Sequence, residues 1–268
     1  MRPAAATPLH FYGMSAPVTR RAVNVNLGCG PGPQPTDWVN VDGSWHARIS
    51  KFKTLRRLLA RLRIIPAENA ELAWTAHLVP ANLSKRLPFA SGTVDCIYAS
   101  HVFEHLYSTA GRALLRESHR ILRLGGVIRL VVPDLRWLAE RYLSEVSRAR
   151  STRDDGLPAD RFVDALHLRP PAKPGGHFVF RMYSALTEFH THKWMYDAES
   201  LSERLRTAGF MEVEERAFHE SRISGIEQVE KAERVLDGAG ICVEGVKSNA
   251  VAESVPASVT RRRPSAAG

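Results

Sequence analysis

The run VIRLVV at residues 127–132 is apolar at every position except Arg129. Strands of a parallel sheet read this way when helices cover both faces of the sheet, whereas a strand with one wet face alternates apolar and polar residues. Other strand-like runs alternate with helical patterns along the chain, which favours an open, doubly wound α/β architecture. We therefore predict a mostly parallel sheet of seven strands with right-handed crossovers.

Residues typical of turns and helix caps indicate where the predicted strands and helices begin and end. Strands are expected at residues 23–27, 38–42, 76–83, 93–100, 127–135, 211–218 and 240–247, and helices at 49–62, 108–124, 135–147, 197–208 and, less regularly, 226–236. Ser108 or Thr109 can cap the second helix, and Gly125 with Gly126 can end it. Asp197 or Ser200 lies near the cap of the helix at 197–208.

The two ends and one internal segment stand apart from this pattern. Residues 1–21 and 248–268 are rich in small, polar or basic residues and are predicted to be flexible tails. The body at residues 22–247 is predicted to be one domain, with an insertion at about 149–192 after the fifth strand. No run approaches the ~18 apolar residues of a membrane span, and the N-terminus lacks a signal-peptide core, so we expect a cytoplasmic protein.

The spacing of the cysteines and the distribution of charge exclude some classes of protein and site. Cys29, Cys96 and Cys242 form no C-x-x-C pair, which argues against a disulfide framework or a thiolate zinc cluster. The net charge is +9, and residues 48–63 alone carry seven Lys or Arg and no acid. We predict that this basic segment is a helix packed on the sheet by apolar residues at helical spacing. They are Ile49, Phe52, Leu55, Leu58, Leu59 and Leu62.

The charged face of the basic segment could bind one of two partners, RNA or an anionic membrane surface. Phe52 is the only aromatic residue within it. Because bases of single-stranded RNA stack on several aromatic side chains, nucleic acid is disfavoured. Peripheral membrane contact through residues 48–63 stays open.

Chemistry-bearing residues gather where the predicted strands end. They are Gly28, Cys29 and Gly30 after the first strand, Asp42 after the second, Asn82 after the third, and Ser100 with His101 after the fourth. Ligands of such sheets bind outside the carboxyl ends of the strands, so these residues are expected to form one site. The glycine spacing is not G-x-G-x-x-G, and the prolines between the glycines leave few free amides. A pyrophosphate is therefore disfavoured, and Asp42 stands where a carboxylate accepts from both hydroxyls of a ribose.

The sequence resembles the class I S-adenosylmethionine-dependent methyltransferases, and more narrowly the bacterial type 11 group. The resemblance rests on VNLGCGPG (25–32), WVNVDGS (38–44), LPFASGTVDCIYASHVFEHL (87–106), LLRESHRILRLGGVIRLVVPDL (114–135) and HKWMYDAESLSERLRTAGF (192–210), in that order. It implies a Rossmann-like methyltransferase fold, S-adenosylmethionine (SAM) as cofactor, and transfer of a methyl group. It says nothing about the methyl acceptor.

The resemblance also implies roles at matching positions. The cofactor-binding residues would be Leu27, Gly28, Cys29, Gly30, Asp42, Gly43, Ser44, Asn82, Leu83, Ser100 and His101. Residues 27–30 would lie under the methionine part, and Asp42 would hold the ribose. Asn82 departs from the acid that many relatives use to accept from the adenine amino group, although an amide oxygen can accept the same hydrogen bond.

Residues 101–105, HVFEH, also match the H-x-x-E-H signature of zinc hydrolases. On a helix, His101 and His105 would lie one turn apart and share a metal, with Glu104 as base. However, the preceding residues read as a buried strand, and spacing alone nominates no third ligand. We therefore favour methyl transfer without a metal. A zinc hydrolase and a noncatalytic binding module with a basic helix are the alternatives.

An oxygen or nitrogen acceptor also has to lose a proton. Histidine titrates near neutrality, so the predicted catalytic residues are His101, Glu104, His105 and His192. His177 and His190 in the insertion are further candidates, with Tyr183 as an orienting group. The insertion would shape the pocket for a small-molecule or saccharide-like acceptor. Its basic residues would tolerate an anionic or sugar-like acceptor, and they are Arg169, Lys173, Arg181 and Lys193.

Overall fold

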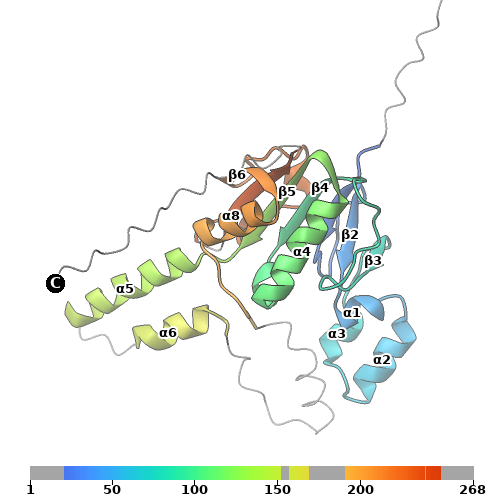
Figure 1. The fold of residues 1–268 in the computed structure, drawn as a ribbon. Coiled ribbons are helices and arrows are strands. Elements are labelled where there is room, and N and C mark those ends of the chain that lie inside the picture. The colour runs from blue at the N-terminus through green and yellow to red at the C-terminus, as the bar shows by residue number, and fades with distance from the viewer. Residues whose placement is uncertain (1–20, 152–156, 169–190, 239, 249–268) are drawn as a thin grey trace, which may run out of the picture.

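The computed structural model describes residues 21–151, 157–168, 191–238 and 240–248. One seven-stranded sheet forms its centre, in the order β3-β2-β1-β4-β5-β7-β6 (Figure 1). The strands are β1 (Asn24–Leu27), β2 (Trp38–Asp42), β3 (Leu78–Pro80), β4 (Val94–Ser100), β5 (Leu122–Val132), β6 (Phe210–Arg216) and β7 (Ile241–Lys247). β7 runs antiparallel to β5 and β6, and the other neighbours are parallel. The predicted mostly parallel, seven-stranded α/β sheet is confirmed.

The helices are short or medium in length. They are α1 (Trp45–Arg48), α2 (Lys53–Arg61), α3 (Ala67–Glu71), α4 (Ser108–Ile121), α5 (Leu135–Ser151), α6 (Pro158–Ala165) and α8 (Ala198–Thr207), with 3₁₀ turns η1 (Phe103–His105), η2 (Ile226–Gln228) and η3 (Ala232–Arg234). In Figure 1, α1, α2 and α3 lie together beyond one end of the sheet, and α5 with α6 extends away on the other side. Among the described residues, no helix is long and apolar enough to cross a membrane.

Some helix boundaries differ from the predictions. α8 begins as expected, because Asp197 caps it and forms a capping box with Ser200. α4 has no side-chain cap, since the Ser108 hydroxyl accepts from Arg204 at 3.1 Å instead. α4 also ends at Ile121, because the chain turns directly into β5. Residues 158–165, within the predicted insertion, form the amphipathic helix α6. Residues 226–236, predicted to be a helix, form two 3₁₀ turns.

Both faces of the sheet are covered, as the apolar run in β5 indicates. On one face, Leu114 and Leu115 of α4 and Leu201 and Leu205 of α8 pack in the larger core cluster. On the other face, the segment at 217–238 packs through Ile223, Ile226, Val229 and Val235. The second cluster includes Trp38 and Tyr98 from the strands. Residues 126–132 of β5 are therefore buried on both faces of the sheet.

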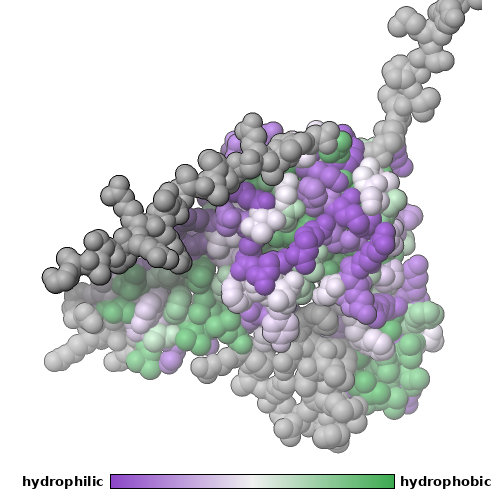
Figure 2. All heavy atoms as spheres, viewed as in Figure 1, coloured by the Kyte–Doolittle hydropathy of each residue, from purple (hydrophilic) through white to green (hydrophobic). Residues whose placement is uncertain are grey.

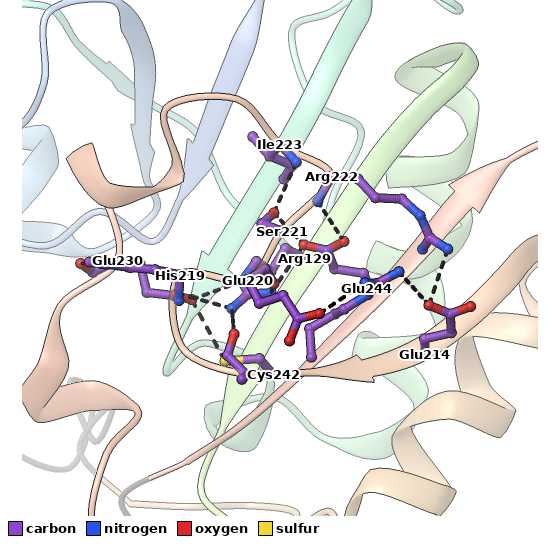
Figure 3. Close-up of polar contacts among 12 residues, drawn as sticks. Arg129, Glu214, His219, Glu220, Ser221, Arg222, Ile223, Glu230, Cys242 and Glu244 are labelled. Atoms are coloured by element: carbon purple, nitrogen blue, oxygen red, sulfur yellow. Dashed lines mark hydrogen bonds and ion pairs between the residues drawn. The ribbon is translucent and has the colours of Figure 1, made fainter.

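The one polar residue of that run, Arg129, lies fully buried under the segment at 217–238. Its guanidinium pairs with Glu230 at 2.8 Å and with Glu244 of β7 at 3.0 Å (Figure 3). It also donates to the carbonyl oxygens of Ala217 and Glu220, both at 2.9 Å. The arginine thus fixes the covering segment to the sheet.

The basic segment packs through its apolar residues only in part. Ile49 is buried and Leu59 half-buried, but the helix is limited to α2, and Phe52 is 59%, Leu58 52% and Leu62 60% exposed. Arg56 is the residue that α2 buries, donating to the carbonyls of Asn69 and Leu72 at 2.9 and 2.7 Å. We call the exposed apolar set the α2 patch. It comprises Trp45, Phe52, Leu55, Leu58 and Leu62. Figure 2 shows hydrophobic residues where Figure 1 places α2.

Candidate active site

The first pocket, which we call the Asp42 pocket, lies at the carboxyl ends of β1, β2 and β4 and holds about 340 Å³. The predicted cofactor residues in its wall are Gly28, Asp42, Gly43, Ser44, Asn82, Leu83 and His101. The wall also contains His105, a predicted catalytic residue, and sequence reasoning missed Trp45, Arg48, Ser84, Val102 and Leu106. Most of these directly follow a predicted residue, so proximity along the chain could have nominated them.

The turn after β1 requires glycine. Gly28 has φ +67°, and a Cβ on it would lie 2.3 Å from Val102 Cγ2. L-residues rarely adopt this backbone region, and the clash adds to that cost. Its amide donates to the Val41 carbonyl at 2.7 Å, which holds the turn against the end of β2.

Asp42 ends β2 and is 8% exposed. Its carboxylate accepts from the Gly30 amide at 3.1 Å and from the Ser44 amide at 2.8 Å. An ionised carboxylate offers about four acceptor positions, so two bonds leave capacity for hydroxyls of a ligand. The backbone amides thus fix Asp42 in an orientation that a diol can use.

Four predicted cofactor residues lie outside the wall of the pocket. Leu27 is buried in the core, and the Ser100 hydroxyl is buried without a hydrogen-bond partner among the described residues. Cys29 and Gly30 belong to the turn itself. Burial, with a smaller contribution from the charge of Asp42, raises the pKa of the Cys29 thiol to about 12, so it stays protonated.

Asn82 stands at the exposed edge of the pocket, after β3. Its Oδ1 accepts from the Ser84 amide at 2.9 Å. The oxygen predicted to replace the usual acid therefore already holds the local turn. A second lone pair on the same oxygen is left for a ligand amino group.

The H-x-x-E-H residues do not lie on a helix face. β4 ends at Ser100, His101 has φ +53°, and residues 103–105 form the 3₁₀ turn η1. Glu104 is fully buried, with Oε1 lying 3.0 Å from His101 Nδ1 and 3.9 Å from His105 Nε2. Both separations are within ion-pair range, yet neither carboxylate oxygen has a hydrogen bond within the described ranges.

His192 joins this group from a distant part of the chain. The amides of Lys193 and Trp194 donate to the Glu104 carbonyl at 2.6 and 3.1 Å, which draws residue 192 beside η1. The His192 ring lies 5.1 Å from the His105 ring and 5.3 Å from the His167 ring. The structure therefore brings together all four predicted catalytic residues, which we call the His/Glu cluster. It consists of His101, Glu104, His105 and His192.

Burial controls protonation within the cluster. It lowers the pKa of His192 to about 4, against a smaller raising effect of Glu104. It lowers the pKa of His105 as well, again opposed by Glu104. Both rings are therefore neutral near pH 7 and present lone pairs for a proton or a cation.

A second pocket, which we call the Trp137 pocket, holds about 600 Å³ and adjoins the cluster. Its described wall comprises His101, Pro133, Trp137, Leu138, Ala165, His167, His192, Ala232, Glu233, Leu236, Asp237 and Gly238. His101 lines both pockets. Sequence reasoning missed most of this wall, because it is assembled from α5, α6 and the segment at 232–238. The insertion residues His177, Tyr183 and His190 lie outside the described residues.

Part of the chain is similar to a known protein family. Residues 25–130 match the family model described as a methyltransferase domain. No curated protein sequence matches the chain.

Three of the solved structures to which this chain is similar are the following. A SAM-dependent methyltransferase of Thermotoga maritima is 18% identical, with a TM-score of 0.40 over 86% of this chain and 84% of that one. A SAM-dependent methyltransferase of Archaeoglobus fulgidus is 15% identical, with a TM-score of 0.42 over 84% and 86%. The YcgJ protein of Bacillus subtilis is 13% identical, with a TM-score of 0.42 over 86% and 94%.

Proposed function

We propose that this chain, a class I SAM-dependent methyltransferase, transfers the methyl group to an oxygen or nitrogen atom of a small-molecule or saccharide-like acceptor. The match over residues 25–130 confirms the predicted enzyme class and cofactor. The acceptor, the roles of individual residues and the extent of the domain are our proposals. We place the activity in residues 22–247, with 149–192 shaping the acceptor side.

The Asp42 pocket is proposed to hold SAM. Asp42 supplies a fixed, partly unsatisfied carboxylate, and Gly30, whose added Cβ would have no atom within 4 Å, leaves the turn open for close approach. Asn82 and Leu83 at the edge would contact the adenine. When bound, SAM supplies an activated methyl group on a sulfonium, so the chain has mainly to align the acceptor and exclude water.

The Trp137 pocket is proposed to hold the acceptor. The observation that carries this proposal is that His101 lines both pockets, so a donor in one and an acceptor in the other meet at the same side chain. Trp137 contributes apolar ring surface to the wall, with the Arg141 guanidinium over the ring at 5.4 Å from its centroid, and Glu233 and Asp237 can accept from hydroxyls.

The His/Glu cluster is proposed to take up the proton that the acceptor loses. His192 faces the acceptor side, and its neutral ring has a lone pair that can accept that proton. Because burial lowers its pKa to about 4, the ring is a weak base by itself, and uptake of the proton depends on stabilisation by Glu104. Glu104 is buried behind the histidines and acts as a positioning residue that stabilises an imidazolium once it forms. A zinc hydrolase is not favoured, because the motif is not helical and the family match is to methyltransferases.

Calorimetric titration with S-adenosylhomocysteine (SAH) tests the donor side. Wild-type protein should bind it, and Asp42→Asn should weaken binding at least tenfold, equivalent to about 1.4 kcal/mol, because hydroxyl bonds to a charged acceptor are lost. Trp137→Ala is the matched control, with unchanged SAH binding. Absence of SAH binding to the wild type would refute the proposal.

A methyl-transfer assay tests the acceptor side. Labelled SAM is incubated with panels of saccharides, nucleotide sugars and small amines or alcohols. For any acceptor found, Trp137→Ala should reduce kcat/KM at least tenfold while SAH affinity is retained. Equal turnover in Trp137→Ala and wild type would show that the acceptor binds elsewhere.

A further inference from the structure

The His/Glu cluster contains more unsatisfied ligand atoms than a proton relay needs. Glu104, His105 and His192 each offer one ligand atom, and the three atoms lie within 4.8 Å of one another. Within the described part of the chain, both Glu104 carboxylate oxygens and His192 Nδ1 are buried without a hydrogen-bond partner. Buried polar atoms are normally paired, so this convergence calls for an occupant.

Backbone carbonyls fix which nitrogen of each ring faces Glu104. The His105 Nδ1 atom lies 3.3 Å from the Thr191 carbonyl oxygen. Since a carbonyl can only accept, Nδ1 carries the hydrogen, and the bare Nε2 faces Glu104 at 3.9 Å. This is the arrangement in which metal-binding histidines are held, with the far N–H donating to a backbone carbonyl.

His101 repeats the arrangement. Its Nε2 lies 3.0 Å from the Arg234 carbonyl, which leaves Nδ1 as the nitrogen 3.0 Å from Glu104 Oε1. A lone pair facing a carboxylate oxygen at this separation is unfavourable unless a positive species lies between or beside them. The cluster is therefore built to receive a cation or an added proton.

We propose that Glu104, His105 and His192 bind a divalent transition-metal ion, with His101 beside it. Two imidazoles and one carboxylate form a ligand set typical of Zn²⁺, Fe²⁺ and Co²⁺. Bonds of about 2.1 Å place neighbouring ligand atoms about 3.5 Å apart, which small side-chain rotations achieve from the present separations.

His192 also lines the Trp137 pocket, so an open coordination position would face the acceptor. The metal site rests on the contacts of the cluster itself. Its role in catalysis rests on the proposed function, because a metal-bound hydroxyl loses its proton more readily than a free one. In that case the His192 lone pair is bound to the ion, the ion lowers the cost of deprotonation, and the proton of the acceptor passes to solvent.

Cobalt titration of tag-free, chelator-treated protein tests the site. Co²⁺ should bind the wild type with one equivalent and give visible ligand-field absorption, and Zn²⁺ should displace it. Glu104→Gln and His192→Ala should each weaken binding at least tenfold. His119→Ala is the matched control, because His119 is a partly buried histidine that packs on Phe210 at the far end of α4.

Thermal melting and SAH titration of each variant establish that it is folded. Wild-type protein that binds SAH but no Co²⁺ would overturn the metal site and leave the transferase intact, with the cluster sharing a proton instead. Binding undiminished in both Glu104→Gln and His192→Ala would also overturn it. Protein that binds Co²⁺ but not SAH would refute only the proposed function.

The α2 patch carries a second, independent inference. Its residues follow a spacing of three or four over Phe52, Leu55, Leu58 and Leu62 and so form one stripe along α2. Arg56, which is 4% exposed, marks the side of α2 that packs on the protein, because it donates to the carbonyls of Asn69 in α3 and of Leu72 just after it. At about 100° per residue, Leu55, Leu58 and Leu62 lie about 100° or more around the helix from Arg56, which leaves them exposed. Contiguous exposed apolar surface of this kind marks an interaction site.

The charges beside the stripe indicate what covers it. Residues 48–63 contain no acid, and Arg57 alone of their basic residues pairs with a carboxylate in the described part of the chain, with Glu71 at 3.1 Å. An apolar stripe bordered by Lys and Arg is typical of helices that lie in the surface of an anionic bilayer. RNA would instead need several aromatic residues for stacking.

We infer that the α2 patch docks on a membrane containing anionic lipid. Trp45 belongs to the patch and also lines the Asp42 pocket, as does Arg48. Docking would therefore bring the active-site entrance to the bilayer surface. An acceptor carried by a lipid would then meet the enzyme there.

Vesicle cosedimentation tests this inference. The full chain should bind vesicles of phosphatidylcholine with 30% phosphatidylglycerol, release them at high salt, and bind pure phosphatidylcholine at least tenfold less. Phe52→Ser with Leu58→Ser should reduce binding at least tenfold. Leu124→Ser with Leu143→Ser, two equally exposed leucines elsewhere, is the control and should bind as wild type.

Three outcomes would overturn the membrane inference. They are equal vesicle binding by both double variants, binding of single-stranded RNA without vesicle binding, and a dimer in solution that the Phe52→Ser and Leu58→Ser changes dissolve. SAH titration of each variant shows whether it is folded. None of these outcomes bears on the metal site.

Discussion

Replacing Arg129 with leucine should be the most destabilising single change in the sheet. The guanidinium is fully buried and makes five hydrogen bonds, three to Glu230 and Glu244 and two to backbone carbonyls (Figure 3). Leucine would fill part of the space and supply none of those donors. Two buried carboxylates would then lack their cation.

The expected loss can be bounded from these contacts. Breaking a buried pair by removing one partner costs about 3 to 5 kcal/mol. Glu244 keeps its bond from the Arg222 amide at 3.1 Å, and Glu230 keeps that from the His219 amide at 2.7 Å, so a value near the middle is expected. A loss of about 4 kcal/mol is a large share of the ~5–15 kcal/mol by which domains are stable. It should lower Tm by about 10 °C for a domain of this size.

Urea unfolding followed by circular dichroism, with thermal melting in parallel, measures this loss. Arg206→Leu is the matched control, because Arg206 is 52% exposed and pairs with Glu203 at 3.8 Å, an interaction worth about 0 to 1 kcal/mol. Adding Glu244→Gln to Arg129→Leu should recover part of the loss by removing one unpaired charge. If Arg129→Leu destabilises no more than Arg206→Leu, the buried network does not hold the covering segment and the reasoning is wrong.

Three further predictions follow from particular groups. With a pKa of about 12, the Cys29 thiol is ionised in about one molecule in 10⁴ at pH 8. Iodoacetamide should therefore modify Cys29 far more slowly in native protein than in unfolded protein, and equal rates would contradict the burial argument. Gly28→Ala should lower stability more than Gly30→Ala, because both have φ +67° but only the first added Cβ meets Val102. Equal losses of stability would assign the cost to backbone strain alone. Burial, and to a smaller extent the charge of Lys247, lowers the pKa of His119 below its unfolded value. The contribution of His119 to stability is therefore lost as pH falls through about 6.5 toward the folded pKa. Between pH 7 and pH 5 the Tm of His119→Gln should fall less than that of wild type, and an identical fall would exclude His119 as a cause.

The sheet could be predicted because its signals are local. Apolar runs, turn glycines and the Asp197 cap act within a few residues, and the positions of all seven strands follow from them. The ends of parallel strands then meet by geometry, which brings Gly28, Asp42 and His101 to one edge without knowledge of any contact. The Trp137 pocket could not be found this way. Its wall depends on contacts between α5, α6 and the segment at 232–238, and these contacts leave no period in the sequence.

The basic segment shows where periodicity fails. The spacing of its apolar residues correctly indicates an amphipathic helix, but a period defines a face and not the neighbour that the face meets. The direction is decided by Arg56, whose partners Asn69 and Leu72 lie 13 and 16 residues further along the chain. Three carbonyl-directed hydrogen bonds, including one to Ser50 at 3.4 Å, hold this arginine in place. The leucines therefore point outward, although their pattern alone favours the core.

The H-x-x-E-H residues show that the same letters give different chemistry on a different backbone. On an α-helix, residues 101 and 105 would share one side, and the glutamate between them would be free to activate a water molecule. Here the left-handed His101 and the 3₁₀ turn η1 place Glu104 at the centre, fully buried, with the histidines around it. His192, held by backbone bonds from the next two residues to Glu104, completes the group. A buried carboxylate cannot activate bulk water, but it can hold a cation or an imidazolium at the junction of two pockets. The geometry therefore favours group transfer between bound molecules over hydrolysis.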